Sequence, residues 1–183
     1  TIVKKYNLFY HLDGARIWNA HVETKIPLSG YGMHFDSVSC CLSKALGAPV
    51  GSIILGSRDF ITEAFRVRMG LGGGMRQAGV IAAAGLYALH NNIDRLFEDH
   101  LKAKELAAFM ASKPNIEIDT DLVQTNIVIF KPLKLSVDEA INKCREKGLL
   151  FSVVKADSIR AVTHLNFSNE DLEKAKKIID EVF

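Results

Sequence analysis

Two apolar segments joined by a short run of chain-breaking residues most strongly constrain how this chain can fold. Residues 36–43 and 52–56 are rich in apolar and small side chains, which predicts two short buried strands. Between them, the sequence KALGAPVG contains two glycines and a proline, which predicts a turn. Because so short a connection joins antiparallel strands more readily than parallel ones, we expect an antiparallel pair in the sheet.

The rest of the sequence divides into two parts of different character. Before the first of these strands, residues 7–13 predict another buried strand that ends at a carboxylate. Helices are expected over residues 14–25, 59–69, 78–89 and 93–112, with a glycine-rich loop at 70–77. Beyond them, four short strands (115–119, 125–131, 149–154, 160–167) are interspersed with helices at 136–148 and 168–183, both of which begin with a serine capping signal. We therefore predict an α/β chain with two domains, 1–92 and 93–183, of which the second is a small α+β domain.

Composition excludes several classes of partner. The net charge of +2 gives no reason to expect nucleic acid or a membrane surface as a partner, and the longest apolar run, residues 78–89, is too short to cross a bilayer. The cysteines are Cys40, Cys41 and Cys144. An odd number without metal-ligand spacing favours reduced thiols in the cytoplasm. The histidines also lack metal-ligand spacing, so no metal site is predicted.

Asp13 and Lys44 are the first candidates for chemistry, because each stands at the end of a predicted strand. If the two strands are parallel neighbours, the carboxylate and the amine face one crevice at the carboxyl ends of the strands. The pair would then be either a salt bridge or a reactive site. A desolvated lysine can lose its proton and form a Schiff base. Pyridoxal phosphate (PLP) is the common partner of such a lysine, and its ring nitrogen requires a carboxylate.

Four motifs are more specific than this spacing. They are HLDGAR at 11–16, SVSCCLSKALGAPVGS at 37–52, LGGGMRQAG at 71–79 and RAVTHLNFS at 160–168. In this order they closely resemble the threonine aldolases, PLP enzymes of fold-type I related to the β-eliminating lyases. The resemblance implies part of the large PLP-binding domain, which has a mixed sheet and an aspartate-aminotransferase-like fold, followed by the small C-terminal domain.

The resemblance also implies a role for each motif residue. Asp13 would pair with the ring nitrogen of PLP, and Arg16 would lie near the ring substituents. Lys44 would be the Schiff-base lysine. Arg76 would reach the cofactor phosphate of a partner subunit, and Arg160 would bind the substrate carboxylate through its two-pronged guanidinium.

The implied activity is retro-aldol cleavage of L-threonine or L-allo-threonine, which are β-hydroxy-α-amino acids, to glycine and acetaldehyde. Members of that family are about twice as long, the size of a two-domain chain. We therefore expect this chain to be the C-terminal portion, with an exposed apolar face and with the N-terminal portion and further copies, as a homodimer or homotetramer, for partners. Two alternatives remain: another fold-type I lyase or aminotransferase, and a non-catalytic fragment of the PLP fold.

Overall fold

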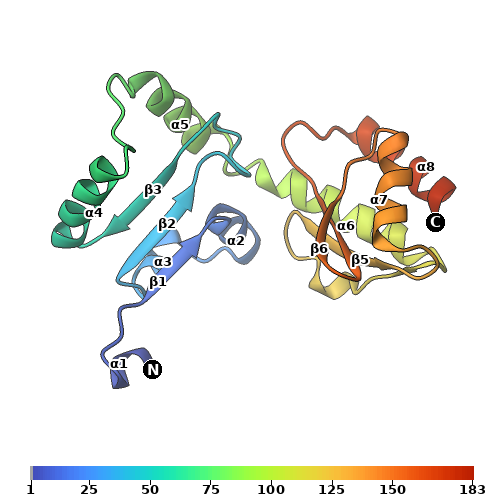
Figure 1. Ribbon diagram of the computed structural model, residues 1–183, viewed down its shortest axis with the longest axis horizontal. Helices are drawn as coiled ribbons and strands as arrows, with labels where there is room; N and C mark the ends of the chain where they lie inside the picture. The colour runs from blue at the N-terminus through green and yellow to red at the C-terminus, as the bar shows by residue number, and fades with distance from the viewer. Residues whose placement is uncertain (1) are drawn as a thin grey trace. The chain divides into compact units, whose positions relative to one another are not determined.

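The computed structural model describes residues 2–183 and divides into two compact units, Thr1–Asp94 and Arg95–Phe183 (Figure 1). We call them the first and the second unit and describe each by itself. Both combine helices with a sheet, as the predicted α/β class requires.

The first unit is built on a three-stranded mixed sheet. Its strands are β1 (His11–Gly14), β2 (Ser37–Cys41) and β3 (Ser52–Gly56), in that order across the sheet. Strand β1 is parallel to β2, with Asp13 opposite Ser39. Strand β3 is antiparallel to β2, with Ser39 opposite Ile54. The antiparallel pair predicted from the short turn is therefore confirmed.

Helix α2 (Ile17–Thr24) follows β1 and contacts the end of β2. Its Trp18 is buried and donates a hydrogen bond from Nε1 to the carbonyl of Cys41 at 2.8 Å. Gly14 lets β1 approach closely, since a Cβ at this position would lie 2.6 Å from the carbonyl oxygen of Ser39. The other helices of this unit are α1 (Ile2–Lys5), α3 (Leu28–Gly32), α4 (Arg58–Gly70) and α5 (Gly79–Asn91). Helices α4 and α5 match predicted helices, whereas α1 and α3 were not expected.

The strand predicted over residues 7–13 is wrong in its first part. The chain turns at Asn7, whose φ is +49°, and the amide of Leu8 donates to the carbonyl of Val3 at 3.0 Å. Leu8, Phe9 and Tyr10 are exposed rather than buried. Pairing with β2 starts only at His11, so the apolar composition of residues 8–10 does not correspond to a strand here.

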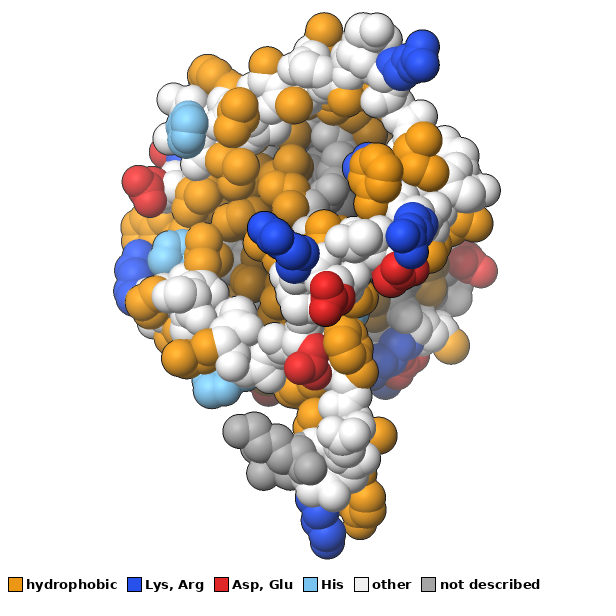
Figure 2. All heavy atoms as spheres, turned by 90° about the vertical axis from the view of Figure 1, so that its left-hand side faces the viewer, with side chains coloured by type: hydrophobic (Ala, Val, Ile, Leu, Met, Phe, Trp, Pro, Cys, Tyr) orange, Lys and Arg blue, Asp and Glu red, His pale blue; other side chains and the backbone are white. Residues whose placement is uncertain are grey.

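The expected exposed apolar face is present in the first unit. Every residue of β3 is exposed, and apolar side chains of β3 and α4 line a hollow of about 870 Å³. Figure 2 looks onto the side of the protein that carries α4 and shows how far hydrophobic side chains extend over its surface. Large apolar side chains that are exposed in this unit include Ile54, Leu55, Phe65, Val67, Met69, Leu71 and Val80.

The second unit packs three helices on an antiparallel sheet. The strands lie in the order β4 (Ile116–Glu117), β5 (Ile127–Pro132), β7 (Ser158–Val162) and β6 (Ser152–Lys155). The helices are α6 (Leu96–Ala111), α7 (Val137–Glu146) and α8 (Asn169–Val182), with a short 3-10 helix η1 at Thr120–Leu122. Val128, Phe130, Ile159 and Ala161 alternate along β5 and β7 and join the helices in one core. All four predicted strands and all three predicted helices of this part are present, although β7 ends at Val162, before the predicted end at residue 167.

Candidate functional site

Asp13 and Lys44 belong to one edge of the sheet of the first unit. Strands β1 and β2 are parallel neighbours, and Gly14 at the end of β1 is opposite Cys40 near the end of β2. Asp13 directly precedes Gly14, and Lys44 follows the end of β2 in the loop to β3. The condition under which the two residues share the carboxyl edge of the sheet is therefore met.

The loop that carries Lys44 is closed by its own backbone. The amide of Leu42 donates to the carbonyl of Gly51 at 3.0 Å, and its carbonyl accepts from Ala48 at 3.1 Å. Gly47, with φ of +72°, donates to the carbonyl of Lys44 at 3.0 Å. Gly51 has φ of +121°. Left-handed backbone at two positions favours glycine, which explains the glycines of the KALGAPVG turn.

Buried side chains and one hydrogen bond from outside the loop anchor it. Leu46 is fully buried, and its carbonyl accepts a hydrogen bond from Nδ2 of Asn92 at 2.7 Å. Ala45 and Ala48 are also buried. The side chain of Lys44 is exposed, so the lysine has an anchored backbone and an amine that reaches solvent.

The described residues do not desolvate the amine of Lys44. The loop buries Ala45, Leu46 and Ala48, whereas Lys44 is exposed. Desolvation of this amine therefore requires a further chain or a ligand.

Asp13 is oriented by a backbone hydrogen bond. Its Oδ1 accepts a hydrogen bond from the amide of Ala15 at 3.1 Å, which holds the carboxylate against the start of the next segment. No ion pair of Asp13 or Lys44 is found in the part of the chain that the structure describes, so a direct salt bridge between them is not present. Arg16 follows in the same segment, is half-buried and occupies the N-cap position of α2.

Arg76 lies in the exposed loop between α4 and α5. The loop contains two residues with positive φ, Gly72 at +76° and Gln77 at +49°. No described hydrogen bond or ion pair connects Arg76 with Asp13 or Lys44. The glycine-rich segment is therefore a connection between helices, as predicted, and presents Arg76 to solvent.

Arg160 lies in the second unit, at the centre of a row across three strands. In the register of the sheet, it is opposite Ile129 of β5 and opposite Ser152 of β6. Its neighbours Ile159 and Ala161 point into the core, so Arg160 points to the sheet face away from the helices. Its Nε donates to Oγ of Ser152 at 3.2 Å.

Arg160 also lacks a counter-ion. Arg95 in the same unit is paired with Asp99 at 2.9 Å, but Arg160 has no carboxylate within ion-pair distance among residues 2–183. The side chain is only half-buried. A partly buried guanidinium without a counter-ion is suited to an external anion, because burial of an uncompensated charge is costly.

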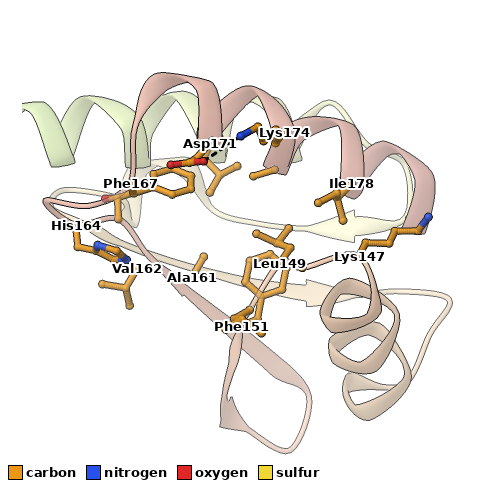
Figure 3. Close-up of a pocket in the computed structure, with 15 residues that line it drawn as sticks. Lys147, Leu149, Phe151, Ala161, Val162, His164, Phe167, Asp171, Lys174 and Ile178 are labelled. Atoms are coloured by element: carbon orange, nitrogen blue, oxygen red, sulfur yellow. Dashed lines mark ion pairs between the residues drawn. The ribbon is translucent and has the colours of Figure 1, made fainter.

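Sequence reasoning missed a hollow of about 350 Å³ in the second unit (Figure 3). It lies between α8 and the segments around Leu149 and His164, and its lining is mainly apolar. The charged groups at its rim are compensated. Lys174 is 3.5 Å from Asp171, and Lys147 is 2.6 Å from Glu181. Arg160 does not line this hollow, and no uncompensated charge marks it as an anion site.

Residues 2–183 carry no candidate metal site. No group of three or more His, Cys, Asp and Glu side chains in this range could hold a metal ion. None of the described helices combines the length and the apolar composition that crossing a membrane requires. The cysteines of the described chain are free thiols.

The fold can be compared with those of solved structures. A mixed sheet followed by a small α+β unit is the fold of the fold-type I enzymes that this chain resembles in structure. Among solved structures, an L-allo-threonine aldolase assigned in Listeria monocytogenes is similar over 100% of this chain and 54% of its own, with a TM-score of 0.79 and 20% identity. An ornithine aminotransferase of Toxoplasma gondii, solved with PLP at partial occupancy in its active site, matches 99% of this chain and 44% of its own, with a TM-score of 0.64 and 17% identity.

The family is shown by sequence. The model of the beta-eliminating lyase family matches residues 1–132, and the chain belongs to this family. A low specificity L-threonine aldolase of Escherichia coli is 40% identical over 171 residues, which are 92% of this chain and 49% of that protein. The chain thus spans about half the length of the curated relatives it matches. The resemblance inferred from the motifs is confirmed.

Proposed function

We propose that this chain contributes the lysine-bearing part of a PLP-dependent aldolase that cleaves L-threonine or L-allo-threonine to glycine and acetaldehyde. The observation that carries the proposal is the anchored loop that holds Lys44 at the same sheet edge as Asp13. Residues 1–92 would belong to the cofactor-binding domain and residues 93–183 to the small domain. The names of the related proteins support the substrate class.

The donor groups at this edge fit PLP. The exposed amine of Lys44 suits the aldehyde carbon, and the carboxylate of Asp13 suits a protonated ring nitrogen. Asp13 is held through Oδ1 by the amide of Ala15, which leaves Oδ2 for that contact. When bound, PLP supplies an electron sink that stabilises the charge left on Cα when the Cα–Cβ bond breaks.

Arg160 would bind the substrate carboxylate. Its guanidinium has no counter-ion among the described residues, and it lies on the open sheet face of the second unit. Two parallel hydrogen bonds from one guanidinium to one carboxylate fix both the position and the plane of the amino acid. Arg16 would contact the ring substituents, and Arg76 would reach the phosphate of a partner subunit's cofactor.

Protons must move at two atoms of the substrate. A base takes the proton of the β-hydroxyl group as the Cα–Cβ bond breaks and acetaldehyde leaves. A proton is then returned to Cα, which gives glycine and balances the reaction. Nζ of Lys44 is a base that this chain can supply, because its loop is fixed while the amine is accessible.

The rest of the site would come from other polypeptide. We propose that the N-terminal portion present in the longer relatives covers the exposed apolar side chains of β3 and α4 and removes water from Lys44. That portion would also carry the phosphate-binding loop. A homodimer or homotetramer would bring Arg76 to a neighbouring site.

The test is acetaldehyde release from L-threonine in the presence of PLP, measured by coupled reduction with alcohol dehydrogenase. The reaction is measured with the chain alone and with the N-terminal portion of a relative added. Lys44→Ala should reduce the rate to background, whereas the matched control Lys134→Ala, at an exposed position without a described ion pair, should keep it. Unchanged turnover of Lys44→Ala would remove this lysine from the mechanism. Release of 2-oxobutanoate and ammonia instead of acetaldehyde and glycine would indicate another lyase.

A further inference from the structure

The contact between Arg160 and Ser152 has a geometry that suits positioning. The two residues are directly opposite each other on the antiparallel strands β7 and β6. Nε of Arg160 donates to Oγ of Ser152 at 3.2 Å, and Oγ of Ser152 lies 3.4 Å from the carbonyl oxygen of Arg160. A hydroxyl group has one proton to donate and two lone pairs to accept with. It can therefore accept from the guanidinium and donate weakly to the backbone of the same residue.

This contact decides which edge of the guanidinium is available. Nε is occupied by Ser152, whereas Nη1 and Nη2 have no described partner among residues 2–183. A carboxylate can pair with a guanidinium through Nε and one Nη or through both Nη groups. With Nε occupied, the edge formed by Nη1 and Nη2 is the one that remains.

We propose that Ser152 is the positioning residue for Arg160 and directs a substrate carboxylate to the Nη1–Nη2 edge. This inference rests on the proposed function of Arg160. The ligand is the α-carboxylate of an amino acid, bound end-on by two parallel hydrogen bonds. Ser152 does not touch the substrate and acts only by holding the guanidinium.

The other neighbours of Arg160 cannot perform this task. Ile129, on the opposite side of the row, is apolar and 46% exposed. Its side chain has no hydrogen-bonding group, so it cannot orient the guanidinium. Strand β6 pairs regularly with β7 at Ser152 and Val153, and its register irregularity lies between Val153 and Lys155. Ser152 therefore lies in the regularly paired part of β6 and is the only described hydrogen-bond partner of the Arg160 side chain.

The direct test is NMR of the Arg160 Nε–H group in the purified chain, with the resonance assigned through Arg160→Lys. In the unsubstituted protein, this proton should exchange slowly with water and the N–H bond should be ordered. Ser152→Ala should accelerate exchange and increase side-chain motion. Ser152→Thr, which keeps the hydroxyl group, should restore the original behaviour. Ser158→Ala is the matched control, since Ser158 is in the same hairpin but bonds to Asp157. Unchanged exchange in Ser152→Ala would overturn the positioning role.

The kinetic test separates this inference from the proposed function. In the active assembly, Ser152→Ala should raise KM for threonine about 2- to 10-fold, the effect of one hydrogen bond, with little change in kcat. Ser152→Thr should recover the KM. If the NMR response is found but KM is unchanged, Arg160 is positioned by Ser152 but does not bind the substrate. Equal losses in kcat and kcat/KM would contradict a role confined to binding the carboxylate.

Discussion

Replacement of Gly14 by alanine tests whether the close approach of β1 and β2 shapes the site. A Cβ at this position would lie 2.6 Å from the carbonyl oxygen of Ser39, and Ile17 and Val38 would each be 3.4 Å away on other sides. Side-chain carbon atoms do not approach a backbone oxygen so closely. Because the oxygen belongs to β2 and cannot rotate away, β1 itself must move.

The cost of this movement follows from overpacking in a buried position, about 1–3 kcal/mol. For a unit of this size, each kcal/mol lowers Tm by about 4–8 °C, so we expect a decrease of roughly 5–20 °C in the first unit. Movement of β1 also displaces Asp13, so aldolase activity should fall in parallel.

The assay is thermal unfolding followed by circular dichroism, with hydrogen exchange of a peptide that contains β1. Gly79→Ala is the control, because its Cβ would have no heavy atom within 4 Å beyond its chain neighbours and its own helix backbone, and alanine is favoured over glycine in a helix. A Gly14→Ala protein as stable as the Gly79→Ala protein would refute the reasoning.

Three further outcomes are expected. The backbone amide and then the hydroxyl of Ser136 hold the pKa of Glu139 below its ordinary value of 4.5. The resulting stabilisation of the folded state is thus present above pH 4.5 and is lost as the pH falls through the lower pKa of the folded state. Glu139→Gln should therefore reduce the decrease of the unfolding free energy at acid pH, measured by urea unfolding at a series of pH values. Burial raises the pKa of Cys144 to about 11, so iodoacetamide at neutral pH should modify it only after denaturation; rapid labelling in the folded protein would contradict its burial. Arg160→Ala should raise KM for threonine about 10- to 100-fold, the value of hydrogen bonds to a charged group, and an unchanged KM would exclude Arg160 from carboxylate binding.

Local signals in the sequence predicted the second unit well. The Ser136 and Glu139 pair forms a complete capping box, and so does Ser168 with Asp171. Gly148 after α7 has φ of +87°, as expected for the residue that ends a helix. These features depend on residues close in sequence, so the sequence alone is sufficient to predict where these helices begin and end.

The first unit was harder to predict because its structure depends on contacts distant in sequence. The apolar residues Leu8, Phe9 and Tyr10 resemble a buried strand, but no described strand pairs with them and they are exposed. The sequence around Lys44 is apolar, but it does not show which of its side chains are covered: the loop buries Leu46 and presents the amine of Lys44 to solvent.

The candidate site was predictable in its position but not in its details. The strand ends placed Asp13 and Lys44 at one sheet edge, and the parallel pairing of β1 and β2 agrees with that placement. Ser152 could not be found from spacing, because its contact with Arg160 depends on the register of β6 and β7. A serine alone in a predicted strand carries no signal for such a role.

The most direct test of the central claim is chemical capture of the cofactor on Lys44. The protein is incubated with PLP, with and without the N-terminal portion of a relative, reduced with borohydride, digested and examined by mass spectrometry. A pyridoxyl group on Lys44, absent from Lys44→Ala, is the predicted result. The absence of any adduct on Lys44 under both conditions, or an adduct only on other lysines, would contradict the account.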